Sequence, residues 1–199
     1  DGMRWPRATG ALLAAAALGR AEWLTFTGGY GSSLAEHRRL GEDLGRATAN
    51  ATRARLAQPA MRLLDAEYCR RGARGLRTLA AFQATHEARF PAYMAELRGI
   101  AAGAGLPFCT VLALNLRAEL RHFLPGPEAA PARRPPAPEA GGCSDFSVWP
   151  YVAHNEDSGG DPQGSLFLFR DLAVGPRRLD GIGYAGELVT GAAGRNDLG

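Results

Sequence analysis

Apolar and polar residues follow two different periods along this chain. From Leu34 to Phe123, apolar side chains recur every three or four residues, which is the spacing of helices that bury one face. Proline and glycine divide this stretch, because proline ends a helix and glycine weakens one. Ser32 or Ser33 is placed to cap the first helix, with Glu36 in its first turn. The pattern predicts helices over residues 34–57, 60–72, 76–86, 92–102 and 107–123.

Beyond residue 142 the period changes to two, which is the spacing of β-strands. An earlier alternating stretch, Trp23–Thr27, predicts one more strand that ends in a turn at Gly28-Gly29. Helices followed by an antiparallel sheet indicate an α+β fold. The later strands are predicted over residues 144–149, 151–156, 165–170, 181–185 and 187–192.

The composition divides the chain into four segments. Residues 1–22 form a leader, in which a basic stretch precedes apolar residues; a signal peptide, an Ala-rich first helix and a disordered leader are the alternatives. Residues 23–124 form a mainly helical part, and the Pro/Ala-rich residues 125–142 form a linker. Residues 143–199 begin a β-sheet part. Because the chain stops in what resembles a turn between two strands, we expect this sheet to be truncated.

Charge and hydropathy narrow the possible partners. The formal net charge of +3 is small and spread along the chain, so nucleic-acid binding is not expected. No run approaches the roughly 18 apolar residues of a membrane span. The chain contains no lysine, which leaves no catalytic or Schiff-base lysine. No cofactor is expected. A cytoplasmic or organellar location is favoured, with secretion as the alternative if residues 3–20 are a signal peptide.

The three cysteines, Cys69, Cys109 and Cys143, form no Cys-x-x-Cys pair. A disulfide framework and a cysteine-based zinc site are therefore not expected. Cys69 and Cys109 lie on helical, apolar-flanked segments and are interpreted as packing residues.

The remaining metal-binding candidates are few. A metal site built from four residues near residue 155 is disfavoured, because Asp157 does not share a face with His154 and no second histidine lies nearby. These four residues are His154, Glu156, Asp157 and Asp161. The other histidines, His37, His86 and His122, are interpreted as surface or capping residues.

Gly142-Cys143 stands between the linker and the first strand of the β-sheet part. Residues 144–148 and 152–156 are predicted to pair as a hairpin. In that register Cys143 faces Asp157, and opposed Cβ atoms lie about 4.5–5.5 Å apart. On the same face Asp145 lies opposite Asn155, whereas His154 and Glu156 point to the other face.

A carboxylate beside Cys143 suits a protein that cuts itself. The Cys143 thiolate can attack the Gly142 carbonyl, and hydrolysis of the thioester frees an α-amine. An α-amine titrates at about 7.7–8.0, so it can deprotonate the thiol, with Asp157 supporting the ammonium. The thiol then forms an acyl-enzyme with an amide or thioester. A cysteine after glycine in a strand also occurs as a small buried hydrophobe, and that alternative stays open.

Three blocks carry a family resemblance. They are Tyr93–Gly105 with its continuation Leu112–Glu119, then Gly142-Cys143-Ser144, then His154-Asn155-Glu156-Asp157. Together they resemble the isopenicillin-N acyltransferase family of N-terminal nucleophile cysteine hydrolases, which includes the β-alanyl-dopamine hydrolases. A weaker match is Glu36–Gly41, which is similar to part of an early helix of the family. Gly186–Gly199 also resembles the family's glycine-rich strand and turn.

The resemblance covers about residues 24–199. It implies an αββα sandwich, cleavage between Gly142 and Cys143, and amide hydrolysis or acyl transfer on a β-alanyl-amine or acyl-coenzyme A substrate. It also implies that Cys143 is the nucleophile, that Asn155 and Asp157 support it, and that the two pieces of the chain stay together.

Two departures from the family pattern matter. The stretch from Cys143 to Asp157 is shorter than the family's usual hairpin. The family's oxyanion asparagine and substrate-side arginine would fall beyond Gly199, so the chain as given is expected to lack full activity.

Two other functions stay open. One is a non-catalytic, truncated homologue that folds in part or binds a partner through its helical half. The other is a thiol hydrolase that uses an uncleaved Cys143, although the predicted register points His154 to the wrong face for this role.

Overall fold

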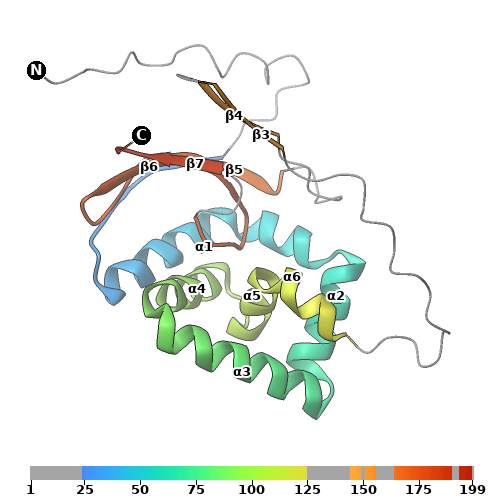
Figure 1. The fold of residues 1–199 in the computed structure, drawn as a ribbon. Helices are drawn as coiled ribbons and strands as arrows, with labels where there is room; N and C mark the ends of the chain where they lie inside the picture. The colour runs from blue at the N-terminus through green and yellow to red at the C-terminus, as the bar shows by residue number, and fades with distance from the viewer. Residues whose placement is uncertain (1–23, 125–143, 149–150, 156–163, 190–192, 199) are drawn as a thin grey trace, which may run out of the picture.

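Helices and strands form two layers in this protein, with the helices below the main sheet in Figure 1. The computed structural model describes residues 24–124, 144–148, 151–155, 164–189 and 193–198. The α+β class predicted from the sequence is confirmed. The helical layer contains α1 (Leu34–Leu56), α2 (Pro59–Asp65), the π-helical turn η2 (Ala66–Arg70), α3 (Ala73–Arg89), α4 (Pro91–Ala104), α5 (Phe108–Asn115), α6 (Arg117–Leu120) and the 3₁₀ turn η3 (Arg121–Phe123).

The first helix begins at the cap that the sequence predicts. The Ser33 hydroxyl accepts a hydrogen bond from Glu36 N at 3.2 Å. Hydrogen bonds from Arg39 and from the Gly31 amide lower the pKa of Glu36 to about 2. The last predicted helix is not continuous, because the backbone leaves the helical conformation at Leu116 and divides it into α5, α6 and η3.

The strands depart from prediction in two places. Gly29, which is predicted to lie in a turn, begins a second short strand that ends at Tyr30. Residues 187–189 form an irregular loop, so the predicted strand 187–192 is wrong over its described part, and the next strand begins at Ala193. The strands are β1 (Thr25–Phe26), β2 (Gly29–Tyr30), β3 (Ser144–Val148), β4 (Tyr151–Asn155), β5 (Leu166–Val174), β6 (Arg177–Tyr184) and β7 (Ala193–Asn196).

The main sheet has the order β1-β5-β6-β7, and β2 also pairs with β5. Strand β6 is antiparallel to both of its neighbours, but β1 and β2 run parallel to β5. The antiparallel pairing predicted for the later strands holds for β5, β6 and β7, and the parallel pairing of the two early strands with β5 is not predicted from the sequence. Residues 25–30 belong to the part of the chain that carries the helices, yet they pair in the same sheet as residues 166–196. The helical part and the β-sheet part therefore form one fold. Strands β3 and β4 form a separate hairpin.

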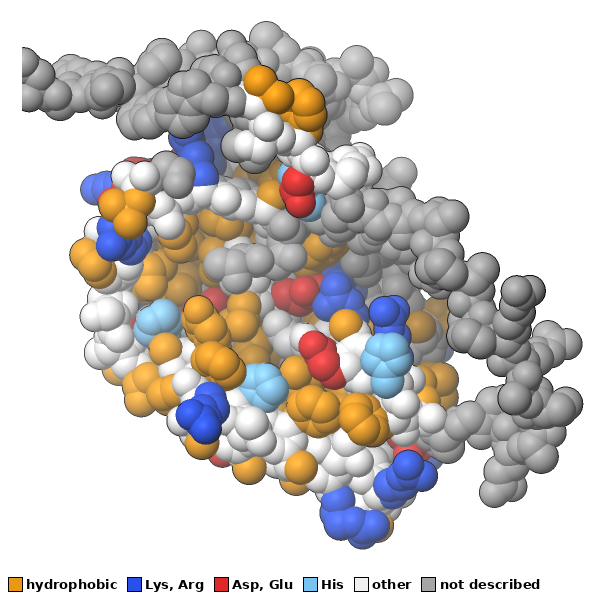
Figure 2. All heavy atoms as spheres, viewed as in Figure 1, with side chains coloured by type: hydrophobic (Ala, Val, Ile, Leu, Met, Phe, Trp, Pro, Cys, Tyr) orange, Lys and Arg blue, Asp and Glu red, His pale blue; other side chains and the backbone are white. Residues whose placement is uncertain are grey.

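The core lies between the main sheet and the helices, where Figure 2 shows hydrophobic side chains. On β5, Phe167 and Phe169 are 1% and 2% exposed, whereas the alternating Leu166 and Leu168 are only half-buried. A Cβ at Gly183 would lie 2.6 Å from the Phe167 ring. A Cβ at Gly181 would likewise lie 2.4 Å from the Phe169 ring. The glycines of β6 therefore make room for the two rings.

Helices α1 and α4 pack backbone against backbone. A Cβ at Gly41 would lie 2.0 Å from Glu96 O, and one at Gly99 would lie 2.1 Å from Arg38 O. Gly45 and Gly103 make equally close approaches to the facing helix. The glycines that recur every four residues on α4 thus serve helix packing. No helix within the described residues is long and apolar enough to cross a membrane.

Cys69 and Cys109 form a disulfide between η2 and α5. The interpretation of these two cysteines as unlinked packing residues is therefore wrong. Their sulfur atoms meet because the turn at η2 brings Cys69 against the start of α5, across 40 residues of sequence. Disulfides persist mainly in oxidising compartments, so this bond weighs against the cytoplasmic location favoured from the sequence.

Candidate functional site

The hairpin that follows Gly142-Cys143 has a different register from the predicted one. Ser144 pairs with Asn155, and Asp145 pairs with His154. The predicted pairing of Asp145 with Asn155 is therefore wrong by one residue, because the turn between the strands is one residue tighter. A shift of one residue exchanges the faces of a strand, so His154 lies on the face of Asp145 and Asn155 on the opposite one.

The two faces of the hairpin differ in chemistry. On one face, His154 Nδ1 lies 2.8 Å from Asp145 Oδ1, so the two side chains form a hydrogen-bonded pair. The other face carries Phe146 and Val148, which are 60% and 53% exposed. Asn155 shares this apolar face and is itself exposed. The predicted supporting residue Asn155 therefore lies apart from the polar pair.

The other residues of the predicted site lie outside the described residues. These are Gly142, Cys143 and Asp157, and the same holds for the metal candidates Glu156 and Asp161. Within the described ranges, no group of three or more His, Cys, Asp or Glu side chains is arranged to hold a metal ion.

A network of buried polar groups holds the loop after β6 against the helices. Asn115 of α5 donates from Nδ2 to Gly186 O at 2.9 Å and accepts from Leu188 N at 3.2 Å. Gly186 has φ 84°, and a Cβ there would lie 2.6 Å from Thr52 Cγ2. Glycine is therefore required for this loop to approach α1 and α5.

The same loop carries a buried carboxylate. Glu187 Oε1 lies 2.5 Å from Arg55 Nη2 and 2.8 Å from Arg117 Nη1. Arg55 also donates from Nη1 to Ala185 O at 2.7 Å, and its guanidinium lies over the Tyr184 ring. Two guanidinium groups thus offset the desolvation of one carboxylate.

A second buried acid lies on α4. Glu96 Oε2 is 3.3 Å from His37 Nδ1, and Glu96 Oε1 accepts from Val189 N at 3.4 Å. Burial raises the pKa of Glu96, and the hydrogen bonds from His37 and Val189 only partly oppose that rise. His37 is largely buried, so its interpretation as a surface or capping residue is wrong.

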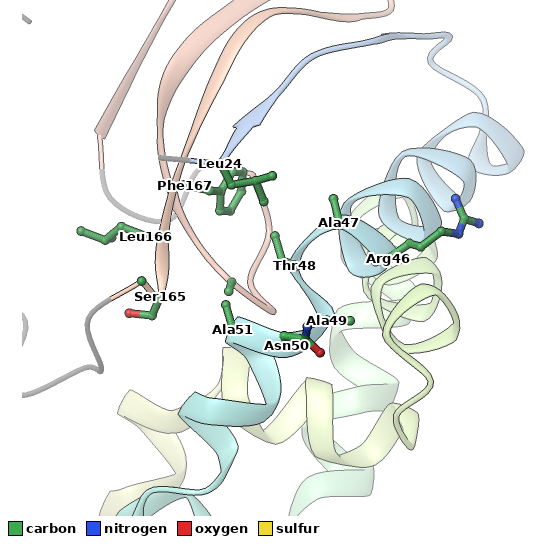
Figure 3. A pocket seen from close by; sticks show the side chains of 12 residues that line it. Leu24, Arg46, Ala47, Thr48, Ala49, Asn50, Ala51, Ser165, Leu166 and Phe167 are labelled. Carbon is green, nitrogen blue, oxygen red and sulfur yellow. The ribbon is translucent and has the colours of Figure 1, made fainter. Parts of the chain in front are cut away.

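A pocket of about 340 Å³ opens between α1 and the start of β5 (Figure 3). Leu24 and Phe167 lie close together on its sheet side, and Thr48 and Ala51 line it from α1. Its polar edge includes Asn50, Arg46 and Ser165. Ala185 joins the pocket to the network, because its carbonyl accepts from Arg55 and its amide donates to Ser165 O at 2.7 Å.

The pocket combines apolar walls at Leu24, Phe167 and Ala51 with polar residues at Arg46 and Asn50. The buried charged side chains pair with one another or with the backbone of the loop after β6. Their chief role is therefore to fix the position of that loop. Sequence reasoning did not single out Arg55, Glu96 or Glu187 for this role. The available signal was a charged side chain at a position where the helical period expects an apolar one, as at Arg55 and Glu96.

None of the protein-family models matches the chain, and no curated protein matches it significantly. The family resemblance therefore stays a prediction that rests on its own sequence blocks.

Proposed function

We propose that this protein is a self-processing cysteine amidohydrolase or acyltransferase that acts on an amide or thioester through Cys143. The observation that carries the proposal is the start of β3 at Ser144, directly after Gly142-Cys143. Cleavage there would leave a cysteine with a free α-amine at the amino end of a strand.

The proposed chemistry uses Cys143 twice. First, the thiolate attacks the Gly142 carbonyl, the peptide nitrogen leaves as the new α-amine, and water hydrolyses the thioester to a Gly142 carboxylate. In the mature protein the α-amine takes the thiol proton, and the thiolate attacks the substrate carbonyl. The substrate's amine or thiol leaves with a proton, and water or an acceptor amine releases the acyl group.

Asp157 and Asn155 are proposed to support the Cys143 amine and the reacting carbonyl. This part of the proposal rests on the sequence resemblance alone, because the register from which the pairing was argued differs in the described hairpin. Replacing Asp157 by Asn tests it through the pH dependence of turnover.

The finer architecture that we propose is an αββα sandwich. Two apolar surfaces support it. The face of the main sheet away from the helices carries the half-buried Leu168 and Ile182, and one face of the hairpin carries the exposed Phe146 and Val148. Apolar sheet faces are usually covered by a second layer, so these surfaces suit the two sheets of a sandwich.

The buried network also supports the family proposal. The first block of the resemblance contains Glu96, Gly99, Gly103 and Asn115, and each of these residues has a specific contact in the fold. These four residues of the block therefore have structural roles in this fold.

Denatured intact mass of the purified protein tests self-cleavage. We expect two pieces, with the second beginning at Cys143, and a single piece for Cys143→Ala. Ser144→Ala is the matched control, because it removes the adjacent hydroxyl and keeps the thiol, so it should still be cut. A single intact chain for the wild-type protein would exclude the self-cleavage mechanism and leave the non-catalytic protein and the uncleaved thiol hydrolase as alternatives. Cleavage that persists in Cys143→Ala would exclude Cys143 as the nucleophile of self-cleavage.

One observation favours a second candidate, a thiol hydrolase that works without cleavage. His154 is oriented by Asp145, which is the relationship between the base and the acid in cysteine and serine catalytic triads. In this alternative His154 would take the thiol proton of an uncleaved Cys143.

The two candidates predict opposite results for His154→Ala. In the thiol-hydrolase alternative the variant should lose turnover. In the leading proposal it should keep both self-cleavage and turnover, because the α-amine of Cys143 acts as the base. Turnover should be measured with matched amide and thioester substrates on the same preparations whose masses are known.

A further inference from the structure

A basic groove lies at one end of the helical layer, where α2 and η2 pack against α5 (Figure 1). Its volume is about 500 Å³, which is within the usual range for small-molecule sites. Leu56 and Ala57 at the end of α1 and Pro107 before α5 complete its walls. The charged residues that line it are Arg53, Arg62, Arg70, Arg71 and Asp65.

Asp65 is the one acidic residue that lines the groove, and both of its carboxylate oxygens have partners. Asp65 Oδ1 accepts from Thr110 Oγ1 at 2.6 Å, and Asp65 Oδ2 lies 2.5 Å from Arg70 Nε. This arrangement fixes Arg70 at the wall and uses both carboxylate oxygens. Four arginines against one aspartate leave an excess of three positive charges around the groove.

Two of the arginines are available to a ligand. Arg62 and Arg71 are exposed, and within the described part of the chain neither has a carboxylate at ion-pair distance. Arg53 is held in place, because its Nη2 donates to Ala104 O at 2.6 Å. Like charges gathered in one concave surface repel each other, and a bound polyanion would relieve that repulsion.

The groove is also tied together covalently. Cys69 immediately precedes Arg70 and Arg71, and Cys109 immediately precedes Thr110. The disulfide between them therefore fixes the arginine-bearing turn against the opposite wall of the groove. A site held in its binding geometry before the ligand arrives loses less entropy on binding.

We infer that this groove binds a phosphate-bearing small molecule through a diphosphate-type group. Arginine matches phosphate because its planar guanidinium donates two parallel hydrogen bonds. An excess of three charges fits a diphosphate better than a single carboxylate, which one arginine would satisfy. The site is independent of Cys143, and its existence does not depend on the proposed function.

Calorimetric titration of the purified full chain with inorganic pyrophosphate tests the site. We expect saturable binding with one site per chain, weakened as salt is raised. The double variant Arg62→Gln/Arg71→Gln should bind at least about tenfold more weakly. The control Arg77→Gln/Arg89→Gln removes the same charge from exposed positions of α3 outside the groove, and it should stay within about twofold of the wild type.

A parallel titration with ADP distinguishes the sources of the phosphate. Tighter binding of ADP than of pyrophosphate would assign the groove to nucleotides, and equal binding would assign it to other phosphate compounds. The inference is overturned if millimolar pyrophosphate gives no binding, or if the α3 control loses as much affinity as the groove variant. Far-ultraviolet circular dichroism of each variant establishes that it is folded.

Discussion

Arg55 of α1 and Glu187 of the loop after β6 form an ion pair across the interface between helices and sheet, with Nη2 and Oε1 2.5 Å apart. Their side chains are only 1% and 10% exposed. The two residues lie far apart in the sequence, so this pair is one of the buried contacts that join the helical layer to the loop after β6.

Removal of Glu187 should therefore be strongly destabilising. Glu187→Ala leaves the Arg55 guanidinium buried without its carboxylate, and breaking such a pair costs about 3–5 kcal/mol. The free energy of unfolding from urea titration gives the measurement. Glu42→Ala is the matched control. Glu42 pairs with Arg38 on the exposed face of α1, so its loss should cost less than about 1 kcal/mol. Equal losses in both variants would contradict a structural role for the buried pair.

Substitution of the interhelical glycines should separate α1 from α4. A Cβ at Gly99 would meet the Arg38 carbonyl at 2.1 Å, and the facing backbone cannot yield as a flexible side chain can. Gly99→Ala should therefore destabilise the protein by about 1–3 kcal/mol or more, although alanine favours helix elsewhere. Gly29→Ala is the control, because nothing lies within 4 Å of its added Cβ. A thermal melt of both variants would decide the matter, and a Gly99→Ala protein as stable as the wild type would refute this packing.

The buried Glu96 predicts a specific pH dependence of stability. Its pKa in the folded state is raised above the ordinary value of 4.5, so the folded state binds its proton more tightly than the unfolded state does. The contribution of Glu96 to stability is therefore complete below about pH 4.5 and is lost as the pH rises through the raised pKa.

Glu96→Gln should remove that dependence, because the amide stays neutral while its oxygen can still accept from Val189 N. The unfolding free energy of the wild type minus that of this variant should fall as the pH rises above 4.5. Chemical denaturation at several pH values measures it. A difference that grows with pH would show that the ionised form is the one stabilised by the fold.

The disulfide predicts a thiol count and a loss of stability. The sequence contains three cysteines, so the denatured and unreduced chain should expose one reactive thiol, that of Cys143, and three after reduction. The bond closes a loop of 40 residues, so Cys69→Ser/Cys109→Ser should lower the unfolding free energy by about 2–4 kcal/mol. Three reactive thiols before reduction, in protein prepared under oxidising conditions, would contradict the bond.

The hairpin shows how a sound local prediction can fail by one residue. The sequence indicated both strands correctly, because each has alternating residues next to a proline-containing turn. It did not decide whether Tyr151 belongs to the turn or to β4. That single residue changes the register, and so it exchanges His154 and Asn155 between the two faces.

The sequence by itself determined the change from helices to strands, the start of α1 at Ser33, the helix boundaries at Pro59, Gly72 and Pro91, and the position of Gly142-Cys143 directly before a strand. These features follow from interactions over a few residues. Only the tertiary structure decided the parallel pairing of β1 with β5, the Cys69–Cys109 disulfide and the Arg55–Glu187 pair. Each of these contacts joins residues far apart in sequence, and their meeting depends on how the helices pack against the sheet.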